Sequence, residues 1–142
     1  MPASCIIRLD NRLEELQRFD TAFNEFARMQ NFSQEVTYAI QLSIDELFVN
    51  IVSYGFEDND DAQHEIEVRI KVFEDRVQID LIDNAKAFNP LTEANEPDLD
   101  ATLEDRRIGG VGIHIVKSMM NEVSYTRTNN KNCLRMVKSL AR

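Results

Sequence analysis

The sequence has little of what marks a secreted, membrane-spanning or metal-bound protein. It contains two cysteines, Cys5 and Cys133, and these form no metal-binding or redox spacing. No apolar run approaches the length needed to span a bilayer, and the N-terminus lacks the basic stretch and apolar core of a signal peptide. These absences predict a cytoplasmic protein, without a membrane partner, whose thiols are reduced and buried.

Basic residues are also scarce. Lys and Arg number 16 against 25 Asp and Glu, which gives a formal net charge of −9. A nucleic-acid-binding surface needs clustered Lys and Arg, so this balance argues against a direct nucleic-acid partner. With 43% hydrophobic and 29% charged residues the chain is globular, and its length suits one domain, residues 1–142, with a single core.

Glycine is the third scarce residue, and its distribution is uneven. Three of the four glycines are Gly109, Gly110 and Gly112, directly before the apolar run 113–120, which we expect to be a helix. Without Cβ atoms, backbone N–H groups can converge there, and the positive end of a helix dipole attracts an anion such as a phosphate. A tight loop required by packing would give the same pattern, so the cluster alone leaves both readings open.

Alternation of apolar and polar residues predicts five strands, which are expected at residues 5–9, 66–72, 77–81, 122–128 and 132–140. The second and third would form a hairpin with one face exposed to water, joined by a turn at Glu74-Asp75. The last two would be joined by a turn at 129–131.

Apolar residues at helical spacing predict two helices between the first strand and the hairpin. Asn11 and Glu14 resemble a capping box at the start of the first, and Ser33 and Gly55 would begin and end the second. Helices that cover one face of a sheet give a two-layer α/β sandwich of the α+β class. We expect its sheet to be largely antiparallel but mixed.

Two places along this order carry side chains suited to chemistry. Glu46 and Asn50 are four residues apart, so they share one helix face, where the amide could ligate a hard cation and the carboxylate could accept a proton. Asp83 ends a strand and opens the aperiodic segment 84–108, as a turn former or as a buried acceptor for a ligand amine. An exposed polar helix face is the alternative for the first pair.

Three segments, in this order and separation, resemble the N, G1 and G2 boxes of the GHKL ATP-binding superfamily, and most closely those of the anti-sigma-factor serine kinases. They are Glu46-Leu-Phe-Val-Asn50, Asp83-Asn-Ala-Lys-Ala-Phe88-Asn-Pro90 and Gly109-Gly-Val-Gly112-Ile-His-Ile-Val. The resemblance continues through 121–138 and covers nearly the whole chain. It implies the Bergerat fold, ATP and Mg²⁺ as cofactors, and an ATP lid over about 84–108.

The resemblance also implies roles for single residues. Glu46 would be the general base, Asn50 would bind Mg²⁺, and Asp83 would accept a hydrogen bond from the adenine amine. Arg106 or Arg107 could reach the terminal phosphate, and the Gly109–Gly112 loop would cradle the phosphates. The other nucleotide-binding residues implied are Ala85, Phe88, Gly110, Val111 and Ile113.

Two positions depart from the family pattern. Ala85 stands where the G1 box usually has Gly, so its methyl group could crowd the base unless the backbone there is compatible with Ala. Tyr54 stands where many relatives have His.

The function implied is an ATP-dependent protein-serine kinase and anti-sigma factor that phosphorylates a small anti-sigma-factor antagonist. A sigma factor is a second implied partner, and relatives commonly form homodimers. The alternative is a non-catalytic regulator in which ATP gates partner binding, which Ala85 favours. A detached histidine-kinase domain is less favoured, because the chain has no separate dimerisation helices with a phospho-accepting His.

Overall fold

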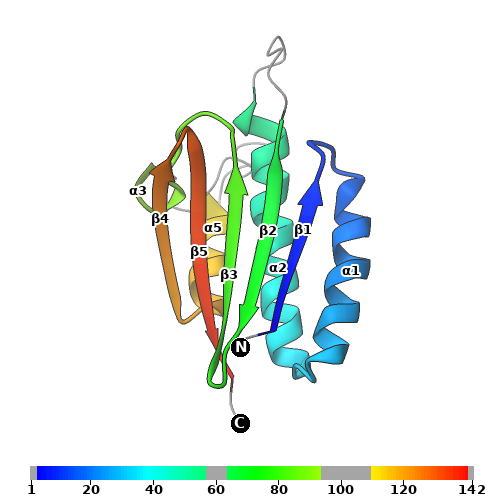
Figure 1. The fold of residues 1–142 in the computed structure, drawn as a ribbon. Coiled ribbons are helices and arrows are strands. Elements are labelled where there is room, and N and C mark those ends of the chain that lie inside the picture. The colour runs from blue at the N-terminus through cyan, green and yellow to red at the C-terminus, as the bar shows by residue number, and fades with distance from the viewer. Residues whose placement is uncertain (1–2, 57–63, 94–109, 141–142) are drawn as a thin grey trace.

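The computed structural model describes residues 3–56, 64–93 and 110–140, which form a five-stranded sheet covered on one face by helices (Figure 1). The strands are β1 (Ala3–Leu9), β2 (Ile66–Val72), β3 (Arg76–Asp83), β4 (Glu122–Thr128) and β5 (Lys131–Ser139). The helices are α1 (Glu15–Met29), α2 (Gln34–Asn50), the π-helical turn η1 (Ile51–Gly55), α3 (Pro90–Glu93) and α5 (Gly110–Met119). None of the helices in these ranges is long and apolar enough to cross a membrane.

The sheet has the strand order β1-β2-β3-β5-β4, and each neighbouring pair is antiparallel. The prediction of a mixed sheet is therefore wrong for the described strands. The connection that contains α5 does make β3 and β4 parallel, but β5 lies between them and pairs antiparallel with both. The predicted strands themselves are confirmed, and so is the two-layer arrangement.

A single core lies between the sheet and the helices. The inward residues of β2 and β3 are buried at every second position, as the alternation predicted. From the helices, Phe19 and Phe23 of α1 and Ile40, Ile44 and Phe48 of α2 are fully buried. Burial of each such side chain contributes about 1.5–3 kcal/mol, so this core dominates the stability of the fold.

The predicted start of α2 is confirmed, whereas that of α1 is not. The Ser33 Oγ accepts a hydrogen bond from the Val36 N–H at 3.1 Å. Glu14 precedes α1 with helical backbone angles and no side-chain cap, and Asn11 instead bonds His64, at 3.1 Å. No capping box forms, and the Glu15 carboxylate instead reaches back to accept from the Asp10 N–H at 3.1 Å.

The glycine cluster differs from prediction in one respect. The helix α5 begins at Gly110, so Gly110 and Gly112 lie in its first turns rather than in a loop before it. Glycine costs about 1 kcal/mol relative to alanine inside a helix, and this weak propensity concealed the helix start. At the other end, the Lys138 ammonium donates to the Met119 carbonyl at 2.9 Å, where a cation complements the helix dipole.

Candidate functional site

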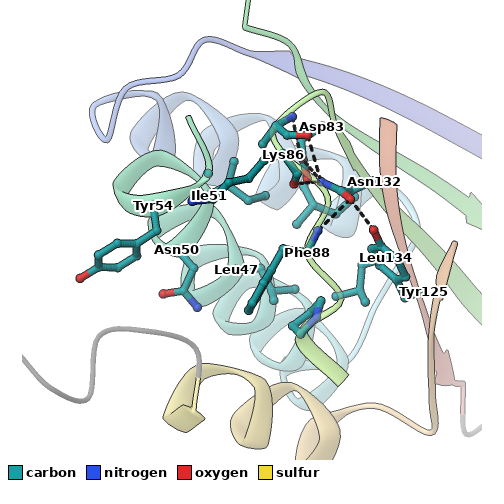
Figure 2. Close-up of a pocket in the computed structure, with 14 residues that line it drawn as sticks. Leu47, Asn50, Ile51, Tyr54, Asp83, Lys86, Phe88, Tyr125, Asn132 and Leu134 are labelled. Atoms are coloured by element: carbon teal, nitrogen blue, oxygen red, sulfur yellow. Dashed lines mark hydrogen bonds between the residues drawn. The ribbon is translucent and has the colours of Figure 1, made fainter. Parts of the chain in front are cut away.

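A cavity of about 200 Å³ lies between the end of α2 with η1 and the segment that follows β3 (Figure 2). Its lining is mostly apolar and includes Leu47, Ile51, Leu81, Phe88 and Leu134. The polar residues Asn50 and Asp83, predicted from separate segments of the sequence, both line it. An apolar slot with few polar groups is the usual form of a site for a flat organic ligand.

Asp83 is the buried acidic residue of this cavity, with 6% of its surface exposed. Its Oδ1 accepts hydrogen bonds from the Ala85 N–H at 3.0 Å and from the Asn132 Nδ2 at 2.9 Å. Burial raises the pKa of the Asp83 carboxyl, while the bonds from Asn132 and Ala85 and the charge of Arg127 act in the opposite direction. The bond to Ala85 confirms the turn-forming role, and the role toward a ligand amine stays a prediction.

Asn132 is a site residue that the sequence reasoning missed. It lies directly opposite Asp83 in the pairing of β3 with β5 and lines the same cavity. A signal was present in the sequence, because Asn132 alternates with the buried Leu134 and Met136 and therefore occupies an inward, apolar position of its strand. A buried amide at such a position needs polar partners.

The segment after Asp83 packs closely on η1. A Cβ atom on Gly55 would lie 3.0 Å from the Cβ of Ala85, which is tighter than nine in ten real Cβ contacts. The Lys86 N–H also donates to the Gly55 carbonyl at 3.3 Å. Gly55, predicted as a helix end, thus leaves room for the Ala85 methyl group, and the backbone here is compatible with alanine.

The helix pair α2 and α5 brings the other predicted residues together. A Cβ atom on Gly112 would lie 3.2 Å from the Asn50 Nδ2 and 3.6 Å from the Glu46 Oε2. One position on α5 therefore faces both side chains, which confirms that Glu46 and Asn50 share a helix face. Glycine at 112 leaves the Asn50 amide undisturbed, because a Cβ atom there would push that amide by a few tenths of an ångström.

The donors at this end suit a shared cation. Among the described residues, no group of three or more His, Cys, Asp or Glu side chains could hold a metal ion alone. Mg²⁺ accepts an amide oxygen, keeps several waters and commonly takes its remaining ligands from substrate phosphates. The Asn50 amide oxygen fits such an ion, provided that the ligand supplies further oxygens.

The structure describes the remaining predicted site residues only in part. Arg106, Arg107 and Gly109 lie outside the described residues, as does the predicted lid beyond residue 93. Gly110 and Val111 are described only by their helical backbone. Ile113 is 3% exposed and belongs to the hydrophobic core, so only its backbone could serve a ligand.

Two neighbouring carboxyl groups, Asp20 of α1 and Asp45 of α2, lie on the α1 side of α2. Burial, together with the neighbouring Asp20 and Glu46 carboxylates, raises the pKa of Asp45 to about 7. Burial also raises the pKa of Asp20. Asp20 Oδ1 and Asp45 Oδ1 are buried without a protein donor. Raised pKa values are expected where two neighbouring carboxyl groups hold one proton between them.

Comparisons with known proteins identify a family and several relatives of the chain. A family model described as a histidine kinase-like ATPase domain matches residues 9–138. The serine/threonine-protein kinase BtrW of Bordetella bronchiseptica is 30% identical over 108 residues, which are 76% of this chain and 74% of BtrW. The serine-protein kinase RsbW of Listeria monocytogenes is 28% identical over 100 residues, and the match spans 68% of this chain but only 62% of RsbW.

A solved structure shares the fold. The crystal structure of the RsbU and RsbW domains of a Mycobacterium tuberculosis protein aligns with a TM-score of 0.69 at 15% sequence identity. The alignment covers 99% of this chain and 33% of that one. At this identity the likeness establishes the architecture alone.

Proposed function

The chain belongs to the histidine kinase-like ATPase domain family, and from this membership we propose that it is an ATP-dependent protein-serine kinase that also restrains a protein partner. The observation that carries the proposal is the meeting of three distant segments. Asp83 and Asn50 line one cavity, and Gly112 faces both Glu46 and Asn50. A buried carboxylate thus lies at one part of the site, and an amide, a second carboxylate and a helix N-terminus lie at another.

In this proposal the nucleotide base enters the apolar slot and its amine donates to Asp83. The phosphates extend toward the N-terminus of α5, where unpaired backbone N–H groups and the helix dipole favour negative charge. Bound Mg²⁺ would neutralise charge on the phosphate oxygens, with the Asn50 amide oxygen as its protein ligand.

Glu46 would complete the reaction as general base. A serine or threonine hydroxyl attacks the terminal phosphorus, its proton passes to the Glu46 carboxylate, and the bond to the bridging oxygen breaks to release ADP. Phosphoryl transfer depends mainly on positioning and charge neutralisation, so one general base and one cation ligand can supply the chemical groups that the protein must contribute.

The partner class rests on the resemblance of the three boxes and on the kinase relatives. We propose a small anti-sigma-factor antagonist as the phosphorylated protein and a sigma factor as the restrained one. The competing proposal, an ATP-gated binder without turnover, was favoured by Ala85. Gly55 leaves space beside that methyl group, which supports a catalytic site that accommodates Ala85.

The test separates Glu46 from Asn50. We expect Glu46→Gln to keep Mg·ATP affinity while lowering transfer of labelled phosphate to a purified antagonist by about 10²–10⁴. Asn50→Ala should instead remove the Mg²⁺-dependent part of nucleotide affinity. Transfer at the wild-type rate by Glu46→Gln would refute the base assignment. ATP-dependent partner binding by a wild type that transfers no phosphate would favour the gated binder.

A further inference from the structure

We propose that Asn132 is a positioning residue of the base site. Its amide holds the Asp83 carboxylate in place, so that the Asp83 Oδ2 can accept a hydrogen bond from the ligand. This inference rests on the proposed nucleotide binding and adds a residue to it. Asn132 is 6% exposed and lies on β5 directly opposite Asp83 of β3 and Arg127 of β4. Figure 2 shows its amide between the segment that follows β3 and Tyr125.

The donor side of the Asn132 amide binds three acceptors. Its Nδ2 donates to the Asp83 Oδ1 at 2.9 Å and to the Lys86 carbonyl at 2.9 Å, with the Ala85 carbonyl at 3.5 Å. These contacts connect the carboxylate to the backbone of the two residues that follow it in the cavity wall. The position of Asp83 is thus coupled to the shape of the segment 84–88.

The acceptor side is equally occupied. The Asn132 Oδ1 accepts from the Tyr125 hydroxyl, from the Arg127 Nη1 at 3.0 Å and from the Phe88 N–H at 3.4 Å. Donors therefore surround the oxygen and acceptors surround the nitrogen, so only one orientation of the amide satisfies the network. Asn132 has no hydrogen-bonding capacity left for a ligand, which makes it a positioning residue rather than a binding one.

The consequence falls on Asp83. Both hydrogen bonds that it accepts within the described ranges fall on Oδ1. A carboxylate oxygen can accept further donors, and Oδ2 is the one that carries no bond from these residues. We infer that a ligand amine binds there, and that losing the Asn132 donor would both release the side chain and destabilise its ionised form.

The groups around Asp83 determine how ligand affinity should depend on pH. Arg127 is the charged side chain that acts on it, from β4 on the far side of β5. The neighbouring strands place the neutral Asn132 of β5 and the apolar Ile66 of β2 opposite Asp83. An amine N–H bonds more strongly to an ionised carboxylate than to a neutral carboxyl group. Affinity should therefore fall as the pH falls through the pKa of Asp83.

The experiment measures ADP affinity between pH 5 and 9 in the absence of Mg²⁺, so that the Asn50 end does not contribute. Asn132→Ala should bind ADP about tenfold more weakly at pH 8, because a buried acceptor has lost its donor. Its affinity should also decline at higher pH than in the wild type. Asn121→Ala is the control, because the one bond that the Asn121 Oδ1 accepts from the described residues comes from the Ser139 N–H, at 2.8 Å, at the other end of β5.

A second variant keeps the shape of the side chain. Asn132→Asp places a carboxyl against Asp83, so the two must share one proton at neutral pH. Its ADP affinity should rise as the pH falls from 8 to 6, opposite in sign to the wild type. A purely structural role would lower affinity without reversing this dependence.

The outcomes separate the two proposals. If wild type binds ADP and both Asn132 variants bind it with the wild-type affinity and pH profile, the positioning role is wrong while nucleotide binding stands. If wild type binds no nucleotide at millimolar concentration, the proposed function fails and this inference fails with it.

Discussion

Replacing Gly112 by alanine should affect thermal stability and Mg²⁺-dependent ATP affinity differently. The unfolding temperature should stay the same or rise, whereas the affinity should fall. Gly112 lies within α5, where its backbone is helical. Alanine is favoured over glycine inside a helix by about 1 kcal/mol. On propensity alone, Gly112→Ala should therefore leave the thermal unfolding temperature unchanged or raise it by a few degrees.

The added methyl group would lie against the side chains of Asn50 and Glu46. The Cβ would lie 3.2 Å from the Asn50 Nδ2, tighter than most real Cβ contacts, and 3.6 Å from the Glu46 Oε2. The Asn50 amide must move by a few tenths of an ångström, and metal–ligand distances in a working site hold to about 0.2 Å. A loss of about 1–2 kcal/mol in cation-dependent binding corresponds to a roughly five- to thirtyfold weaker affinity.

The assay compares ATP affinity with and without Mg²⁺, beside thermal unfolding of each protein without ligand. Ser118→Ala is the matched control, because Ser118 is exposed on the same helix and, within the part of the chain that the structure describes, its hydroxyl bonds only the Ile115 carbonyl, at 2.8 Å. The Mg²⁺-dependent gain in affinity should shrink in Gly112→Ala and persist in Ser118→Ala. An unchanged gain in Gly112→Ala, with a stable fold, would refute the placement of the cation at Asn50.

Three further substitutions test the surrounding structure. Gly55→Ala should destabilise the protein by about 1–3 kcal/mol through its 3.0 Å contact with Ala85, and adding Ala85→Gly should restore most of the loss in a chemical denaturation curve; no restoration contradicts the pairing. Asp45→Asn should flatten the dependence of unfolding temperature on pH. In the wild type the folded pKa of Asp45 is raised to about 7, so its contribution to stability is complete below the unfolded pKa near 3.8 and is lost as pH rises through 7. A variant that keeps the wild-type dependence on pH contradicts the shared proton. Ser33→Ala should cost about 1 kcal/mol of unfolding free energy as the cap of α2 is lost, and a cost near zero contradicts the role of its hydroxyl.

Local patterns predicted most of the architecture because each depends on near neighbours. The alternation in β2 and the helical spacing in α2 follow from which side of one element is buried, and the structure confirms both. The same locality explains the error at α1. The predicted capping box needed only Asn11 and Glu14, but the side chain that bonds the backbone before the helix is Glu15, which also pairs with Arg18.

Asn132 could not be found by the same means. It lies 49 residues from Asp83 in sequence, and only the register of β3 with β5 makes them neighbours. A slip of one residue would turn Asn132 to the uncovered face and leave Asp83 without its donor. The sequence indicated that Asn132 faces inward, whereas its partner is set by strand pairing.

The scarcity of glycine gains a physical explanation from the same structure. Left-handed backbone angles are carried by asparagine, with φ of 58° at Asn31 after α1 and 54° and 61° at Asn129 and Asn130 in the last hairpin. Asparagine tolerates these angles, so turns and helix ends here do not require glycine. Neither Gly55 nor Gly112 adopts such an angle, and both lie where a side chain would collide with a neighbour. Close approach, rather than backbone flexibility, accounts for these two glycines. Since one borders the Asp83 end of the site and the other the Asn50 end, substitution at either should affect binding through displaced neighbours rather than through altered backbone freedom.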